Sequence, residues 1–324
     1  LDDAVLYLRV YFVGFPFLFM YNALSATFNA LGDSRTPLGF LIFSSLTNIG
    51  LDLWFVIQFH MGVAGGALAT LIAQGIAAGL SFMLLIHRLR KMPDSSGEEP
   101  VSGNRWYSTE LLGLMVKIAV PSIIQQSIVS VSMLMVQAVI NPYGSSVVAG
   151  YSAALKIDSV AIMPMQAVGN AMSTFTAQNL GAGQKERVRQ GYRTSYLIIL
   201  SFSAILLIAT QLFYRPILSA FLDVESSPVA YSTGASYLRF IGFFFCFLGF
   251  KALTDGVLRG AGDVGVYMAA NLVNLSIRVA VAQLCSPVWG IEFVWYAVPL
   301  GWGTNYIISY LWYRTGHWEK KNLV

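Results

Sequence analysis

The stretch Thr47-Asn48-Ile49-Gly50-Leu51-Asp52 lies inside an apolar run from Leu38 to Phe59, and it constrains how the chain can fold. A helix needs about 20 apolar residues to cross a bilayer, and this run has that length. Asp52 is the only acidic residue in the run. A carboxylate at such a depth costs roughly 2.5–3.5 kcal/mol on insertion scales, so Asp52 needs either a partner or a function.

Two neighbouring polar residues point to the same place as Asp52. Asn48 lies one helical turn before it, and the next apolar run, Val63–Ile86, carries Thr70 after the turn Phe59–Gly62. With a rise of about 1.5 Å per residue, Asp52 and Thr70 lie roughly 10 Å below one membrane surface. We therefore predict that these three side chains meet in one polar pocket. The alternative is a polar contact that only joins two helices, as Asn and Thr often do.

Composition indicates the class of protein. Of the 324 residues, 56% are hydrophobic and 11% are charged, whereas soluble domains average about 25% charged residues. The apolar runs are too long for the strands of a membrane barrel, so we predict an all-α, polytopic membrane protein. The net charge of +4 then reflects the loops and does not indicate a nucleic-acid partner.

We expect nine membrane-spanning helices. One segment, residues 91–109, clusters Pro, Ser, Gly and charges and is the best candidate for a linker. It would separate residues 1–90, with three helices, from residues 110–324, with six. The runs that contain Pro121 and Pro164 are long, so we expect either kinks or extensions past the bilayer. The nine segments are Leu6–Ala30, Leu38–Phe59, Val63–Ile86, Leu111–Ile140, Val147–Leu180, Tyr196–Leu218, Tyr237–Leu258, Val266–Leu284 and Ile291–Tyr313.

The loops between these segments differ in charge. Loops on one side hold most of the basic residues, whereas the opposite loops contain no Lys or Arg, apart from Arg215 near one helix end. Because basic loops stay in the cytoplasm, we predict a cytoplasmic inter-lobe loop and C-terminus. The basic positions are Arg35, His87–Lys91, Arg105, Lys185–Arg193, Arg259, Arg314, Lys320 and Lys321; the opposite loops are Phe59–Gly62, Asn141–Ser146, Asp223–Tyr231 and Ser286–Gly290.

The sequence also contains an internal repeat. Tyr7-Leu8-Arg9 recurs as Tyr237-Leu238-Arg239, and Gly32-Asp33 recurs as Gly262-Asp263, both at an offset of 230 residues. Three predicted spans precede the second copy, and none precedes the first. By symmetry we expect about three further helices before Leu1, which would give two six-helix halves related by an axis along the membrane normal.

These features resemble the multidrug and toxic compound extrusion (MATE) family of cation-coupled exporters, in particular its Firmicutes-type members. The resemblance covers the whole chain and implies twelve helices in two lobes, of which this chain would supply the fourth to the twelfth. The stretches that carry it are Asn29–Pro37, Asn48–Asp52, Gly62–Thr70, Ala149–Asp158, Thr176–Gly183 and Leu258–Asp263.

The resemblance also implies a coupling site. It would consist of Asn48, Asp52 and Thr70, with Tyr7 as a weaker match, and it would take a proton or sodium; no other metal or cofactor is implied. The family's first-helix Asp has no counterpart here. Relatives that bind sodium in the C-terminal lobe use acidic residues there, but Ser122–Val129 contains none.

Further polar residues lie inside the apolar runs and are candidates for a substrate cavity or a gate. Lys251 and Asp255 are one turn apart, so the simpler interpretation is a neutralising pair. Lys156 and Asp158 do not share a helix face, so we expect a partner for each on another helix, and Arg278 should also pair. The full set is Gln125, Gln126, Lys156, Asp158, Lys251, Asp255 and Arg278.

We therefore expect a secondary exporter of drug-like or organic cationic molecules, driven by proton or sodium entry through alternating access. It would be a monomer in the bacterial plasma membrane, with small organic substrates and the bilayer as its partners. A flippase for lipid-linked oligosaccharides is the alternative. An enzyme is disfavoured, because the sequence contains neither HExxH nor GxSxG.

Overall fold

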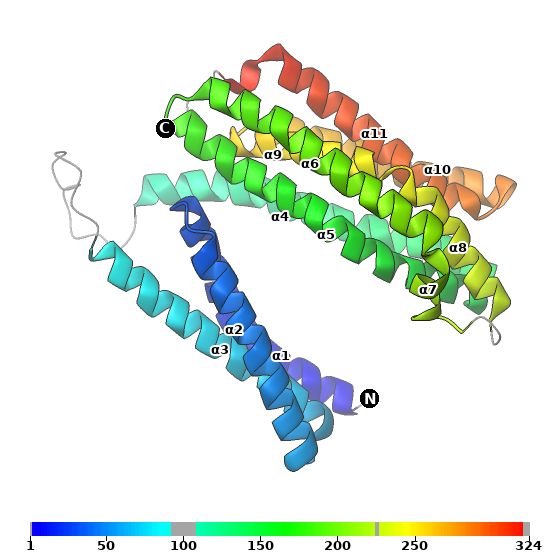
Figure 1. Ribbon diagram of the computed structural model, residues 1–324, viewed down its shortest axis with the longest axis horizontal. Coiled ribbons are helices and arrows are strands. Elements are labelled where there is room, and N and C mark those ends of the chain that lie inside the picture. The colour runs from blue at the N-terminus through cyan, green and yellow to red at the C-terminus, as the bar shows by residue number, and fades with distance from the viewer. Residues whose placement is uncertain (1, 92–107, 224–226, 320–324) are drawn as a thin grey trace. The chain divides into compact units, whose positions relative to one another are not determined.

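The computed structural model in Figure 1 describes residues 2–91, 108–223 and 227–319, and within these ranges it contains helices and no strand. The chain divides into two compact units, Leu1–Arg105 (unit 1) and Trp106–Val324 (unit 2). The division falls inside the predicted linker 91–109, of which residues 92–107 lie outside the described ranges. Lys320 and Lys321 also lie outside them.

Unit 1 is a three-helix unit arranged around α3. Its helices are α1 (Asp2–Ala30), α2 (Arg35–Leu53), the short π-helix η1 (Trp54–Gln58) and α3 (Gly62–Leu89). Both α1 and α2 pack on α3, whose small side chains Ala69, Ala73 and Ala78 are almost fully buried. Small residues let neighbouring helices approach closely in a bilayer, where the hydrophobic effect does not drive helix association.

Unit 2 holds the large core of the molecule. Its long helix α5 packs against α8 and α9, while α10 packs on α11 and on α4. The elements are α4 (Thr109–Ile140), η2 (Asn141–Tyr143), α5 (Ser145–Gly181), α6 (Lys185–Leu212), α7 (Tyr214–Ser219), α8 (Pro228–Gly242), α9 (Phe245–Gly260), α10 (Val264–Trp289), α11 (Glu292–Thr315) and η3 (His317–Glu319).

The contacts of α5 involve glycine backbone. A Cβ added at Gly256 of α9 would lie 2.3 Å from the carbonyl oxygen of Gly169 in α5, and one added at Gly150 would lie 2.2 Å from the carbonyl oxygen of Ala230 in α8. Only glycine permits backbones to approach this closely. The α5–α8–α9 packing is therefore fixed by main-chain contact at both ends.

The membrane-spanning segments agree in part with those expected. Over the described ranges seven helices are long and apolar enough to cross a membrane, and α8 with α9 makes an eighth if this bent pair is one span. The ninth predicted span forms α11, which has 24 residues but is not among these. Its buried Asn305 and Ser309 show that its interior face is partly polar.

The bend between α8 and α9 was not predicted. The sequence suggested one run, Tyr237–Leu258, whereas the two helices meet at 55°. A Cβ at Gly242 would lie 2.2 Å from Thr210 Oγ1 of α6, so α8 ends in close contact with α6. By contrast, α5 runs through Pro164 as one helix of 37 residues, which is longer than a bilayer span requires.

The sequence repeat has a structural counterpart. In unit 1 the amide of Asp33 bonds to the carbonyl oxygen of Phe28, and in unit 2 the amide of Asp263 bonds to that of Leu258, at 2.9 and 2.8 Å. Gly32 and Gly262 have φ of +83° and +72°. Both helices therefore end in the same left-handed glycine motif, for which glycine is the favoured residue.

Candidate functional site

The predicted polar pocket of unit 1 forms between α2 and α3. Asn48 Nδ2 donates a hydrogen bond to Thr70 Oγ1 at 3.3 Å, and Thr70 Oγ1 donates to the carbonyl oxygen of Gly66 at 3.0 Å. A Cβ placed at Gly66 would lie 3.7 Å from Asp52 Oδ1. The structure thus brings Asn48, Asp52 and Thr70 together around Gly66, as the depth argument predicted.

Asp52 is incompletely satisfied in this pocket. Its Oδ1 is buried and has no hydrogen-bond partner among the residues that the structure describes. A buried acceptor left without a donor costs roughly 1–3 kcal/mol, and more if it is charged. The π-helix η1 begins two residues after Asp52, and such local widening is common at functional sites.

Tyr7, the weakest member of the predicted site, makes no hydrogen bond to these three side chains among the described residues. It is exposed, and its ring stacks on Tyr11 of the same helix with centroids 6.2 Å apart. Its part in coupling therefore stays a prediction.

Unit 2 contains a polar cavity of about 390 Å³ within the helix bundle. Six of the seven candidates from the sequence line it: Gln125, Gln126, Asp158, Lys251, Asp255 and Arg278. The seventh, Lys156, is exposed and lies outside the cavity. The partner on another helix that the sequence suggested for Lys156 is not found within the described part of the chain.

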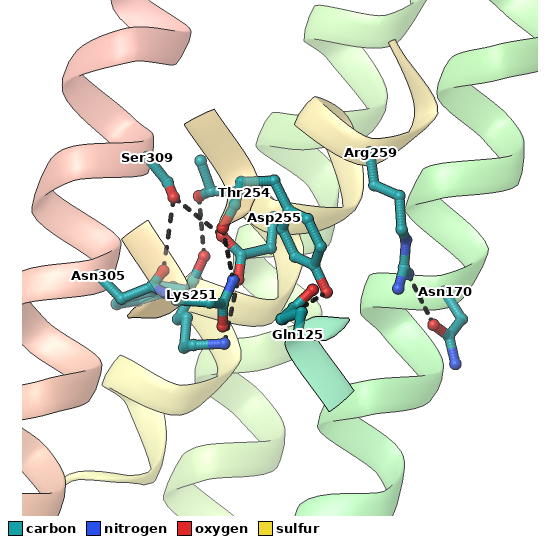
Figure 2. Close-up of polar contacts among 11 residues, drawn as sticks. Gln125, Asn170, Lys251, Thr254, Asp255, Arg259, Asn305 and Ser309 are labelled. Atoms are coloured by element: carbon teal, nitrogen blue, oxygen red, sulfur yellow. Dashed lines mark hydrogen bonds and ion pairs between the residues drawn. The ribbon is translucent and has the colours of Figure 1, made fainter. Parts of the chain in front are cut away.

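Asp255 is the centre of a buried network in this cavity (Figure 2). Lys251 Nζ and Asn271 Nδ2 donate to its Oδ2 at 3.0 and 3.1 Å, and Ser309 Oγ donates to its Oδ1 at 2.8 Å. The Lys251 and Asp255 side chains are only 12% and 7% exposed. The predicted neutralising pair is therefore confirmed, and it joins α9 to α10 and α11.

A second carboxylate in the cavity, Asp158, is less completely bonded. Tyr237 Oη donates to its Oδ2 at 2.9 Å, while its Oδ1 is buried without a hydrogen-bond partner among the described residues. Arg278 lines the same cavity, and its charge acts on Asp158. Tyr237 of α8 is thus the partner on another helix that the sequence required but could not name.

Tyr267 and Arg259 are cavity residues that sequence reasoning missed. Gln125 Nε2 donates to Tyr267 Oη at 3.1 Å, and Arg259 Nη2 donates to Asn170 Oδ1 at 2.7 Å (Figure 2). Arg259 was assigned to a basic loop, but it belongs to α9 and lines the cavity. Arg259 lies one residue before the end of α9, and helix boundaries predicted from sequence are uncertain by more than that, so this role was hidden.

Comparison with known proteins supplies the family. A family model described as MatE matches residues 121–284, just over half of the chain. The probable multidrug resistance protein YpnP of Bacillus subtilis is 32% identical over 99% of this chain and 70% of its own length. The chain belongs to the MATE family. YoeA, also a probable multidrug resistance protein of Bacillus subtilis, is 30% identical over 98% of this chain and 68% of its own length.

The fold is also that of MATE transporters. The solved structure of a MOP superfamily transporter from Pyrococcus furiosus superposes with a TM-score of 0.88, covering 98% of this chain and 71% of that one at 22% identity. The relatives are transporters and not enzymes, and this MATE protein is accordingly a bacterial inner-membrane protein that acts on small molecules. A second family model, lipid II flippase MurJ, matches residues 3–145, but the relatives that match the whole chain do not favour a flippase.

Proposed function

We propose that this MATE protein exports drug-like or organic cationic molecules in exchange for protons or sodium ions, and that Asp52 is the coupling residue. Relatives named as probable multidrug resistance proteins over the whole chain support the substrate class. The single observation that supports the coupling role is the Oδ1 of Asp52, which is buried beside the Asn48–Thr70 hydrogen bond and has no hydrogen-bond partner among the residues described.

An isolated carboxylate at this depth has two means of relief. It takes up a proton, which removes its charge, or it binds a sodium ion, for which its oxygen atoms are suitable ligands. Asn48 and Thr70 carry further oxygen atoms within the same pocket. Loading and unloading of Asp52 changes the charge between α2 and α3, and such a change biases the two states of an alternating-access cycle.

The cavity of unit 2 is the proposed substrate-contacting surface. It combines the carboxylates Asp158 and Asp255 with the cations Lys251 and Arg278. Because Lys251 neutralises Asp255, Asp158 is the carboxylate available to a cationic substrate. The substrate would compete with Arg278 for this carboxylate. We further propose a monomer, with the arginine-rich helix ends in the cytoplasm.

The experiment measures efflux activity as drug uptake into everted membrane vesicles that contain the native protein, with a proton gradient or a sodium gradient imposed separately. Asp52→Asn retains the shape of the side chain and removes its charge. We expect efflux to fall at least tenfold under whichever gradient drives the parent, a factor that corresponds to about 1.4 kcal/mol of coupling free energy.

Two further variants are compared with Asp52→Asn: Thr70→Ala in the same pocket, and Ser127→Ala as a control. Thr70→Ala removes one neutral partner and should reduce efflux less than Asp52→Asn does. Ser127 bonds only to a carbonyl of its own helix, so Ser127→Ala should leave efflux unchanged. Parental efflux and parental ion dependence in Asp52→Asn would show that Asp52 is structural.

A further inference from the structure

A second concavity of unit 2, of about 630 Å³, lies at the arginine-rich end of the bundle. It runs between the first turns of α6 and the last turns of α11, and both helices pack on α9 between them (Figure 1). We call it the arginine–tyrosine groove. It is lined by Arg189, Tyr192, Arg193, Tyr196, Tyr306, Tyr310, Tyr313, Arg314, Gly316, Trp318 and Glu319.

The walls of the groove are held in place by contacts between tyrosines. The rings of Tyr192 and Tyr313 lie with centroids 4.3 Å apart, and Tyr196 and Tyr306 share a hydrogen bond between their hydroxyl groups. The hydroxyl of Tyr192 also bonds to Thr254 Oγ1 of α9 at 2.7 Å. The groove is therefore preformed, since three helices fix the orientation of its aromatic lining.

The charges in the groove are unbalanced. Arg189 pairs with Glu319 at 2.7 Å, but Arg193 and Arg314 have no carboxylate partner in the described ranges. Arg314 Nη1 makes only a long bond to Tyr310 Oη, 3.5 Å. Three arginines against one glutamate leave an excess of two positive charges, which two unpaired guanidinium groups can direct at a single anion.

The position of the groove selects the kind of anion. Just beyond it, Leu197 of α6 and Ile307 and Leu311 of α11 are 66%, 56% and 61% exposed. Such large apolar side chains face lipid in a membrane protein, whereas tyrosines and arginines at helix ends lie at headgroup depth. The groove therefore opens where the phosphates of phospholipids are, at the ends of lipid-facing helices.

We propose that the arginine–tyrosine groove binds the phosphate of an anionic phospholipid, held by Arg193 and Arg314 and by the tyrosine hydroxyl groups. Guanidinium groups bind phosphate oxygens through paired N–H donors. The acyl chains of the lipid would lie along the exposed apolar faces of α6 and α11. None of these residues belongs to the proposed coupling site or to the cavity of Asp158 and Asp255, so the groove is independent of both.

The test is lipid binding to the purified, detergent-solubilised full chain by native mass spectrometry, with phosphatidylglycerol as the probe. Each basic residue near a headgroup strengthens binding about fivefold, so Arg193→Gln/Arg314→Gln should weaken binding about twentyfold. The matched control, Lys185→Gln/Arg187→Gln, removes the same charge from residues of α6 that do not line the groove and should change it by less than about threefold.

Further measurements with another lipid, a charge-retaining variant and inorganic phosphate identify the ligand and detect misfolding. Phosphatidylcholine should bind at least about tenfold more weakly than phosphatidylglycerol, because its headgroup has no net charge. Arg193→Lys/Arg314→Lys retains the charge and should recover most of the binding, which a misfolded protein would not do. Equal losses in the groove variant and the control would overturn the proposal. Displacement of phosphatidylglycerol by equimolar inorganic phosphate would overturn the assignment to a lipid.

Discussion

Helix α1 of unit 1 and the α8–α9 pair of unit 2 are copies of one sequence element with different shapes. α1 runs unbroken from Asp2 to Ala30, although it contains Gly14 and Pro16. Its copy, which has Phe244 and Cys246 at the corresponding positions, bends by 55° between α8 and α9. Gly14 and Pro16 therefore do not break α1. The bend follows Gly242, which stands where α1 has Phe12, and a Cβ at Gly242 would lie 2.2 Å from Thr210 Oγ1 of α6.

The turns that follow these helices have the same backbone conformation, but their Asp side chains bond to different partners. Asp33 accepts from Arg88 and Thr36, joining α2 to the end of α3, whereas Asp263 accepts from the Trp312 indole of α11. The carboxylate after the glycine thus keeps its place in both units. Its partner on the last helix is charged in one and neutral in the other.

The interiors of the units differ in a related way. In unit 2 the carboxylate of Asp255 has a cation and two neutral donors, while in unit 1 Asp52 has neither a cation nor a donor to its buried oxygen in the described ranges. At the offset of the repeat, Asn48 corresponds to Arg278. The difference indicates that the charge of Asp255 is neutralised by Lys251, whereas the charge of Asp52 is open to change.

The largest expected effect tests this contrast in charge. Lys251→Met leaves the buried Asp255 without its cation, and removing one partner of a buried pair costs about 3–5 kcal/mol. Thermal unfolding of the purified protein should show a large loss of stability, partly recovered in Lys251→Met/Asp255→Asn. Asp52→Asn should leave the melting temperature unchanged or raise it. A loss in Asp52→Asn as large as that in Lys251→Met would contradict the contrast.

A smaller effect tests the glycine packing. Gly256→Ala places a methyl group against the Gly169 carbonyl, and overpacking of this kind costs about 1–3 kcal/mol. Gly39 in α2 has open space at its Cβ position, so Gly39→Ala should be neutral or stabilising by up to about 1 kcal/mol. The measurement is the melting temperature of each variant in detergent. Equal responses would mean that α5 and α9 separate more easily than the structure indicates.

The smallest effect concerns the Asp33 turn. Hydrogen bonds from the Thr36 hydroxyl and amide, with the charge of Arg88, lower the pKa of Asp33 to about 2. Because the pKa is lowered on folding, the ionised carboxylate stabilises the fold at pH values above the ordinary carboxyl pKa. This stabilisation is lost as the pH falls toward 2. Arg88→Gln should lower the melting temperature by less than about 3 °C at pH 7, because the pair is partly exposed. The difference from the parent should shrink below pH 4; a difference that grows in acid would be inconsistent with the pairing.

Sequence reasoning succeeded where geometry is local. Asp52 and Thr70 flank a short turn, so helix rise alone fixed their common depth, and the Asn48–Thr70 bond follows from it. The Lys251–Asp255 pair was predictable in the same way, because residues four apart share a helix face. Both predictions concern residues within one helix or within two helices joined by a short turn.

Sequence reasoning failed where contacts join helices that are far apart in the chain. The bond from Tyr237 to Asp158 and that from Ser309 to Asp255 each join residues far apart in the chain, and no periodicity encodes them. Lys156 was expected to find a partner of this kind, yet it is exposed. Apolar patterning identifies the helices, but which polar faces meet is decided by the packing of the whole unit.

The glycine contacts of α5 also limit how unit 2 can move. A slide of α9 along α5 by one residue, about 1.5 Å, would bring a Cβ into space that the Gly169 and Ser173 carbonyls now fill opposite Gly256 and Gly260. Shear between these helices is therefore blocked, and α5 and α9 must travel together as one rigid body. The contact of Gly150 with Ala230 ties α8 to α5 in the same way, so α5, α8 and α9 form one rigid group within unit 2.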